Sequence, residues 1–216
     1  MSNFIAKKQV NSDYYEFKNY MSKERWCSIY HQIDEIISRK PDSVLEVGMG
    51  QGVTKNYVKS NFNIKYDTLD IDEELKPDFV GSILEMPFDD SQYDIVCSYQ
   101  VLEHLPFALF HEALSELFRV AKQAVIISLP NAQKMFKFQI TWVYKSRLYK
   151  CPFFRLKQLK PHDQHHWEIN RKGFEINVVR KVLLDTAQKS GFALCKEYRD
   201  WDNPVHHFFI MEKLNN

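Results

Sequence analysis

The stretch "VLEVGMGQG", Val44–Gly52, decides the fold. Three apolar residues surround one acid, Glu46, and glycine then occupies every second position. This pattern predicts a buried strand that runs into a turn where the backbone comes close to a ligand. The turn departs from the dinucleotide pattern G-x-G-x-x-G, because Val53 stands where the third glycine should be. Glu46 would repel a pyrophosphate and attract a ligand that carries an ammonium or sulfonium group.

Strand and helix patterns alternate along the rest of the chain. Strands are predicted at 43–47, 64–70, 77–83, 93–99 and 124–130, with a closing pair at 193–201 and 204–213, and helices at 22–39, 54–60, 107–121 and 174–192. The run 124–130 is apolar throughout, as in a strand covered on both faces. This alternation predicts an α/β domain with a parallel, doubly wound, Rossmann-like sheet.

Composition narrows the class of protein. The 216 residues, 44% of them hydrophobic, suit a single α/β domain. The N-terminus lacks the apolar run of a secretory signal, and no stretch of 18 uncharged apolar residues predicts a membrane span. The four cysteines are far apart, which favours reduced thiols over a disulfide framework. We therefore predict a cytoplasmic protein.

The net charge is only +1, but acidic and basic residues are concentrated in different parts of the chain. Residues 67–103 hold eleven acids and one base, whereas residues 131–161 hold eight bases, seven aromatic residues and no acid. The basic segment could bind RNA, lie on an anionic membrane, or close as a lid over an anionic small molecule or glycan. The lid is favoured, with peripheral membrane contact as an addition, because the rest of the chain is not basic.

S-adenosylmethionine fits the glycine turn and Glu46. Its methionyl end carries an ammonium group, its sulfonium is cationic, and it has no phosphate. Its ribose hydroxyls need an acceptor, and Asp70 ends the second predicted strand about twenty residues after the turn, the usual spacing of a ribose-binding acid.

On these residues the sequence resembles the class I S-adenosylmethionine-dependent methyltransferases, the bacterial kind called methyltransferase type 11. The likeness covers roughly 40–130 through "VLEVGMGQG", "TLDID", "GSILEMPFDDSQYDIVCSYQVLEHLP" and "LFRVAKQAVIISLPN". It implies a seven-stranded, mostly parallel sheet with the last strand antiparallel and helices on both faces. One departure is Ala121-Lys122-Gln123, where the family often has Pro-Gly-Gly.

The resemblance also implies a cofactor site and a domain plan. The cofactor would be S-adenosylmethionine and the product S-adenosylhomocysteine. The cofactor-binding residues would be Glu46, Gly48, Gly50, Gly52 and Gln100 at the methionyl end, Asp70 and Ile71 at the ribose, and Ser82, Ile83 and Leu84 around the adenine. Residues 1–216 would form a single methyltransferase domain, with a helical flap at 1–40 and a basic aromatic lid at 131–170.

Methyl transfer is an in-line displacement that needs a base only when the nucleophile is protonated. His162, His165 and His166 lie within five residues and are the predicted catalytic bases. They could instead cap and pack the final helix. Together with Asp163 they could ligate zinc, but the spacing matches no familiar motif, so no metal is predicted. His104 is assigned a structural role, and strand alternation points one of His206 and His207 inward.

The predicted function is methyl transfer to an oxygen or nitrogen atom of a small molecule or of a glycan or lipid-linked acceptor. The alternatives are a non-catalytic S-adenosylmethionine-binding or scaffold protein, and an RNA methyltransferase. Arg25 is a candidate partner of the methionyl carboxylate, beside N-terminal aromatic residues that could cover the cofactor.

Overall fold

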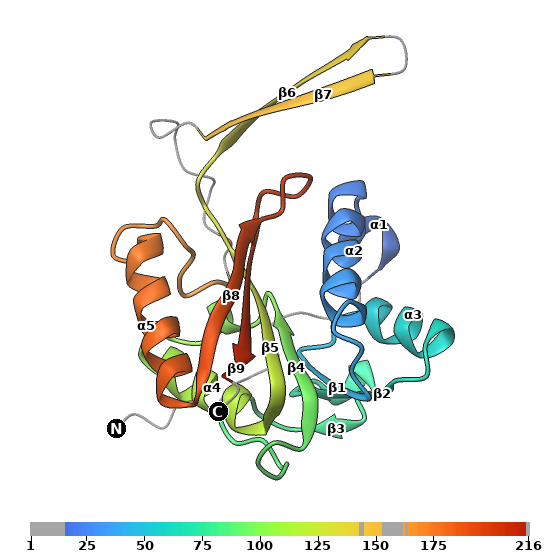
Figure 1. The fold of residues 1–216 in the computed structure, drawn as a ribbon, viewed down its shortest axis with the longest axis vertical. Helices are drawn as coiled ribbons and strands as arrows, with labels where there is room; N and C mark the ends of the chain where they lie inside the picture. The colour runs from blue at the N-terminus through green and yellow to red at the C-terminus, as the bar shows by residue number, and fades with distance from the viewer. Residues whose placement is uncertain (1–15, 143–144, 153–161, 163, 215–216) are drawn as a thin grey trace.

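The computed structural model describes residues 16–142, 145–152, 162 and 164–214 (Figure 1). The helices are α1 (Phe17–Tyr20), α2 (Lys23–Ile37), α3 (Val53–Asn61), α4 (Phe110–Val120) and α5 (Ile176–Lys189). The strands are β1 (Ser43–Val47), β2 (Lys65–Asp70), β3 (Phe79–Val80), β4 (Tyr93–Tyr99), β5 (Ala121–Pro130), β6 (Met135–Trp142), β7 (Lys145–Pro152), β8 (Phe192–Arg199) and β9 (His206–Lys213).

Seven strands form one sheet in the order β3-β2-β1-β4-β5-β9-β8. The pairs from β3 to β5 are all parallel, and β9 runs antiparallel to both β5 and β8. This confirms the predicted seven-stranded, mostly parallel sheet with the last strand antiparallel. Several bounds differ from the sequence pattern; in particular, β3 is only two residues long and β5 starts at Ala121.

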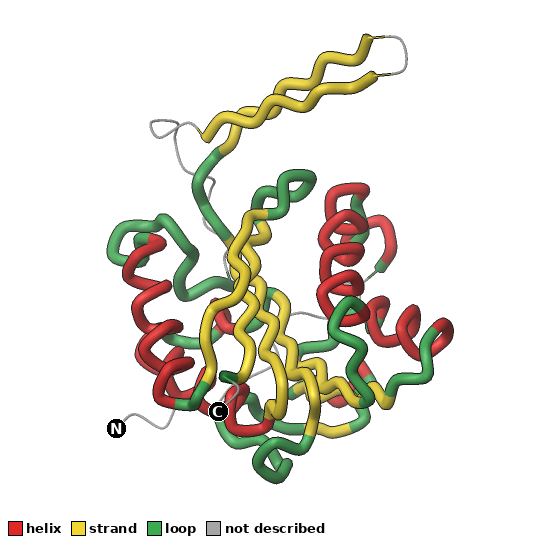
Figure 2. Tube along the Cα trace, in the orientation of Figure 1, coloured by secondary structure: helices red, strands yellow, loops and turns green. Residues whose placement is uncertain are grey.

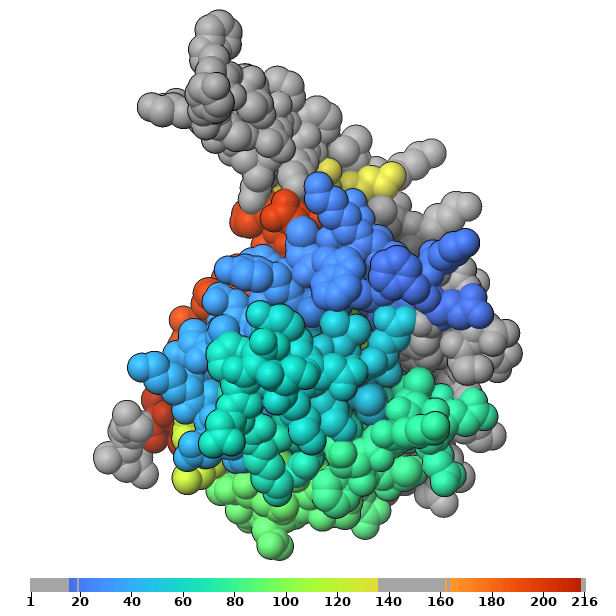
Figure 3. Space-filling view, turned by 90° about the vertical axis from the view of Figure 1, so that its right-hand side faces the viewer, coloured from blue at the N-terminus to red at the C-terminus, as the bar shows by residue number. Residues whose placement is uncertain are grey.

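The sheet has a hydrophobic layer on each face. α4 and α5 pack together on one face, and α2 and α3 lie on the other (Figures 1 and 2). Leu114 and Leu183, from α4 and α5, belong to one core cluster, whereas Ile36 and Val58, from α2 and α3, belong to the other. β4 is buried along its whole length because both of its faces are covered. Figure 3 shows the outer surface of α2 and α3.

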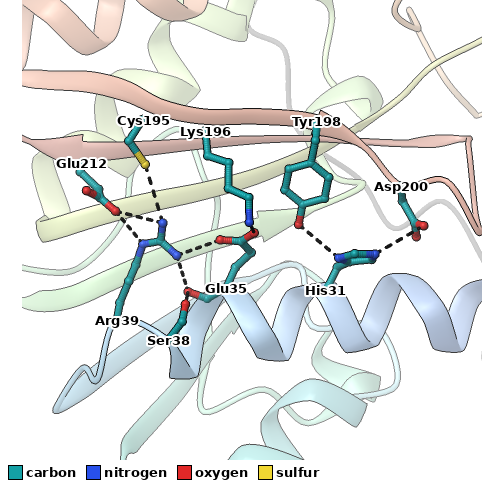
Figure 4. Close-up of polar contacts among 9 residues, drawn as sticks. All are labelled: His31, Glu35, Ser38, Arg39, Cys195, Lys196, Tyr198, Asp200 and Glu212. Carbon is teal, nitrogen blue, oxygen red and sulfur yellow. Dashed lines mark hydrogen bonds and ion pairs between the residues drawn. The ribbon is translucent and has the colours of Figure 1, made fainter.

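Charged side chains attach α2 to the far edge of the sheet (Figure 4). Lys196 of β8 donates to Glu35 over 2.5 Å, and Arg39 donates to both Glu35 and Glu212 of β9 at 2.9 and 3.0 Å. Burial alone would raise the pKa of Glu35, but these hydrogen bonds outweigh it and hold the pKa below its usual value. The network fixes α2, and α2 forms one wall of the site described below.

The basic segment after β5 contains an element that the sequence analysis did not predict. β6 and β7 form an antiparallel hairpin with an unbroken register from Met135↔Pro152 to Trp142↔Lys145. The hairpin extends away from the seven-stranded sheet (Figure 1). The other predicted lid residues between 153 and 161 lie outside the described residues, as do Tyr14 and Tyr15 of the predicted flap.

Among the described residues, no helix has the length and apolar character needed to cross a membrane.

Candidate cofactor site

The turn after β1 needs its glycines for geometric reasons. Gly48, Gly50 and Gly52 all have positive φ, at 82°, 52° and 66°. A Cβ on Gly48 would lie 2.2 Å from Cγ2 of Val101, in the loop that follows β4. Glycine is therefore needed at position 48 for two reasons: the backbone is left-handed, and a side chain would block the close approach of the two loops. The turn ends at Gly52, the N-cap of α3.

A cleft that is open to solvent lies beside this turn, at the carboxyl ends of β1 and β4. Its lining residues are Tyr20, Arg25, Ile29, Gln32, Glu46, Gly48, Met49, Gly50, Gln51, Val53, Thr54, Tyr99, Gln100 and His206. Four of the ten predicted cofactor-binding residues are therefore in the cleft: Glu46, Gly48, Gly50 and Gln100.

Glu46 is the buried acid of the cleft. Its residue is 4% exposed, and one carboxylate oxygen accepts a hydrogen bond from the Tyr66 hydroxyl at 3.1 Å. Burial raises the pKa of Glu46 to about 8, although Tyr66 and Lys55 act to lower it. A cationic group bound beside Glu46 would favour the charged carboxylate and lower that pKa.

Asp70 lies at the end of β2, next to β1 in the sheet. Its two carboxylate oxygens accept hydrogen bonds from the backbone N–H groups of Met49 and Asp72, both at 3.0 Å. Asp70 is absent from the cleft lining, but Met49 is part of it. A carboxylate has about four lone-pair sites, so Asp70 retains capacity for a ribose diol. Ile71 follows and is 40% exposed.

The predicted adenine residues lie in the turn after β3. Gly81 donates its N–H to Asp70, and Leu84 donates its N–H to the Ser82 hydroxyl at 3.2 Å. Ile83 is 5% exposed and belongs to the core. None of Ser82, Ile83 and Leu84 lines the cleft, and their contact with adenine stays a prediction.

Gln100 sits in the loop after β4 with a positive φ of 57°. Its backbone N–H donates to Ser128 of β5 at 3.0 Å, and its side-chain amide donates to the Ser128 hydroxyl at 3.3 Å. These two bonds hold Gln100 at the cleft wall, and its contact with the methionyl end stays a prediction.

The outer wall comes from the N-terminal helices and from β9. The Arg25 guanidinium stacks over the Tyr20 ring at 3.9 Å, and both line the cleft, whereas Phe17 and Trp26 are largely exposed. His206 also lines the cleft, and burial lowers its pKa to about 3, so its imidazole is neutral near pH 7.

The expectation that only one of His206 and His207 points inward is wrong. Both are buried, because β9 lies between β5 and β8 and is covered on both faces. The contributions of His206, Gln32, Thr54 and Tyr99 to the cleft have no local sequence signal. They depend on which loops and strands the fold brings together.

The three predicted catalytic histidines are not among the residues that line the cleft. His162 and His166 are exposed, and His165 is half-buried with its ring stacked on that of His162 at 4.5 Å. His165 instead lies next to His104, with ring centroids 4.9 Å apart. Burial lowers the pKa of His104 to about 4 and also lowers that of His165. The catalytic role of the three histidines stays a prediction.

Comparison with known proteins agrees with this geometry. Residues 45–129, from β1 through β5, match the family model described as a methyltransferase domain. The part of the chain that runs from β1 through β5 is therefore similar to a methyltransferase domain. The predicted fold is thereby confirmed, and the family model bears out the predicted resemblance to methyltransferases.

Individual proteins share little sequence identity with this chain. The methyltransferase domain and its flanks are 25% identical over 195 residues to a probable chloroplastic tocopherol O-methyltransferase of Oryza sativa subsp. japonica. That alignment takes in 82% of this chain but 42% of the relative, so the chain spans about two fifths of that relative's length.

Two solved structures share the fold. Magnesium protoporphyrin IX methyltransferase from Synechocystis PCC 6803, solved with bound SAH, superposes with a TM-score of 0.58 at 12% identity, over 97% of this chain and 90% of that one. Small RNA methyltransferase HEN1 superposes with a TM-score of 0.61 at 15% identity, over 98% of this chain and 27% of that one. Their named substrates differ in class, so this likeness leaves the acceptor open.

Proposed function

We propose that the protein transfers the methyl group of S-adenosylmethionine to an oxygen or nitrogen atom of a small molecule, or of a glycan or lipid-linked acceptor. The observation that carries the proposal is the cleft in which the Glu46 carboxyl group lies buried beside a glycine turn, with Arg25 also among the lining residues. An acid and a base facing one cleft match the ammonium and carboxylate of the methionyl end.

In this proposal the chain's own residues bind and orient the cofactor. Glu46 pairs with the methionyl ammonium group, Arg25 with its carboxylate, and Asp70 with the ribose hydroxyls. Bound S-adenosylmethionine supplies an activated methyl group with a good leaving group. The remaining work of the protein is to align the acceptor in line with the methyl group at roughly 3 Å and to exclude water.

The acceptor side is proposed to involve the hairpin of β6 and β7. Every second residue of β6 is aromatic or apolar, namely Phe136, Phe138, Ile140 and Trp142, and the segment 131–161 carries eight bases. This composition suits an acceptor with both apolar and anionic parts, including a lipid-linked one at a membrane surface. Cytoplasmic localisation and the division into flap and lid stay predictions.

The test is methyl transfer from S-adenosylmethionine labelled in its methyl group. The full chain is incubated separately with a small-molecule fraction, a lipid extract and total RNA, and product is recovered from each. The proposal expects label in the small-molecule or lipid arm, dependent on Gly48. Label found only in RNA would contradict the proposal and favour an RNA methyltransferase. Binding of labelled cofactor without methyl transfer in any arm would favour a non-catalytic S-adenosylmethionine-binding protein.

A matched pair of variants controls for folding. Gly48→Ala places a Cβ against Val101, whereas Gly173→Ala imposes the same positive-φ strain at a position with open space around it. Transfer should be lost only in the first variant.

A further inference from the structure

A second group of chemistry-bearing side chains lies outside the cofactor cleft. Glu103 and His104 end the 3₁₀ helix Leu102–His104, just after β4, and His165 comes from the segment before α5. Two hydrogen bonds hold these segments together. The His166 N–H donates to the Glu103 carbonyl at 2.9 Å, and the Trp167 indole donates to the Leu105 carbonyl at 3.1 Å.

Within the described part of the chain, the Glu103 carboxyl group has none of the hydrogen-bond partners that its burial demands. Its residue is fully buried, and neither carboxylate oxygen accepts a hydrogen bond from any described residue. The ring nitrogen Nε2 of His165 is 3.9 Å from Oε1, too far for a hydrogen bond. A buried carboxyl group without partners either holds a proton or is neutralised by a cation, so this group can accept a cationic ligand.

The two imidazoles are oriented as metal ligands are. Nδ1 of His165 contacts Oε1 of Glu168 at 2.9 Å, and Nδ1 of His104 contacts the Gln164 carbonyl at 3.2 Å. Glu168 is itself held by Arg171 at 2.8 Å. When each Nδ1 donates its proton in this way, Nε2 carries the lone pair. A histidine fixed by a carboxylate or a carbonyl at its outer nitrogen is the usual arrangement around a protein-bound metal ion.

We propose that Glu103, His104 and His165 bind a divalent transition-metal ion of the zinc type. One ligand atom from each residue lies within 4.8 Å of the others. Bonds of roughly 2.0–2.2 Å in tetrahedral geometry place ligand atoms about 3.3–3.5 Å apart, so small side-chain shifts complete the site. Three protein ligands leave a fourth position for water or a ligand, and two imidazoles favour zinc, cobalt or nickel over magnesium.

The sequence analysis predicted no metal because it considered only the local group His162, His165, His166 and Asp163. The structure combines His165 with residues some sixty positions earlier, and leaves His162 and His166 exposed. Glu103 comes three residues after Gln100, so the site shares the loop that forms one wall of the cofactor cleft. The proposal does not depend on methyl transfer.

The experiment measures metal binding by the full-length, tag-free chain after dialysis against a chelator. Co²⁺ is titrated and followed by visible absorption, and Zn²⁺ affinity is measured by competition with a chromophoric chelator. The expected result is one equivalent per chain, with the intense visible bands of tetrahedral Co²⁺. Glu103→Gln and His165→Ala should each weaken Zn²⁺ binding at least about 100-fold, and Glu168→Gln, which acts through His165, about 10- to 100-fold.

Matched controls separate the site from general surface binding. Glu112→Gln and His111→Ala change exposed residues of the same types on α4 and should leave the affinity unchanged. Far-UV circular dichroism checks that each variant folds. If His165→Ala does not fold, the near-isosteric variants Glu103→Gln and Glu168→Gln still test the site. Sub-stoichiometric binding, affinity unchanged in both glutamine variants, or the near-ultraviolet bands of cobalt–thiolate ligation would each overturn the proposal.

Discussion

The protonation state of Glu46 gives the sharpest prediction about cofactor binding. With a pKa of about 8, the carboxyl group is about nine-tenths protonated at pH 7 in the free protein. A methionyl ammonium group beside it should lower that pKa toward its usual value of 4.5. Binding at pH 7 therefore has to remove about 0.9 proton, which costs about 1.4 kcal/mol.

The ionisation of Glu46 determines how the affinity for the ligand changes with pH. As the pH rises from 6 to 7, the free carboxyl group becomes easier to ionise, so the affinity for S-adenosylhomocysteine should rise nearly tenfold. The window stays below the titration of an α-amino group, about 7.7–8.0. His206, whose pKa is about 3, stays neutral throughout and does not contribute.

Calorimetric titration checks this in two buffers of different ionisation enthalpy. The difference between the observed heats at pH 7 should report about 0.9 proton released per ligand. In Glu46→Gln, the proton release should vanish and the affinity should become flat between pH 6 and 7. Tyr66→Phe removes the donor that favours the charged carboxylate, so it should shift the rise to higher pH. A pH dependence that persists unchanged in Glu46→Gln would refute the reasoning.

Three further predictions concern the turn, the ribose acid and the fold. Gly48→Ala should weaken S-adenosylmethionine binding at least about tenfold, because its Cβ would collide with Val101, and equilibrium dialysis measures this. Asp70→Asn loses acceptor capacity next to the Met49 N–H and should weaken binding by about 1–3 kcal/mol, and wild-type affinity would contradict the ribose assignment. Glu197 has a pKa of about 2, since its hydrogen bonds outweigh the effect of burial, so Glu197→Gln should lower the free energy of unfolding by roughly 2–3 kcal/mol at pH 7. That loss should shrink between pH 4.5 and 2, and urea denaturation at several pH values would detect it.

The sequence predicted the fold well because its signals are local. The apolar run of β5, the glycine turn after β1 and the helical periodicity of α4 each lie within a few residues. The resemblance to a family then supplied the number of strands and the antiparallel last strand, whereas the strand order comes from the structure. The hairpin of β6 and β7 escaped prediction because its basic, aromatic composition was interpreted as a lid rather than as paired strands.

The sequence predicted those residues of the cofactor site that belong to a single motif with a recognisable ligand chemistry. Glu46 and Gly48 follow from the turn, and the cleft contains both. Arg25 of α2, a candidate from the sequence, also lines the cleft, whereas His206 reaches it from β9 and only the tertiary fold brings it there. The proposed metal site at Glu103 and His104 was not predicted either, because its third residue, His165, is far away in sequence.

The central claim is that the cleft beside the glycine turn binds S-adenosylmethionine. Equilibrium dialysis of the full chain against labelled S-adenosylmethionine tests it most directly, with Gly48→Ala and Gly173→Ala in parallel. The account predicts one equivalent bound per chain, competed by S-adenosylhomocysteine, retained in Gly173→Ala and lost in Gly48→Ala. No saturable binding to the wild-type chain, or equal binding to both variants, would contradict it.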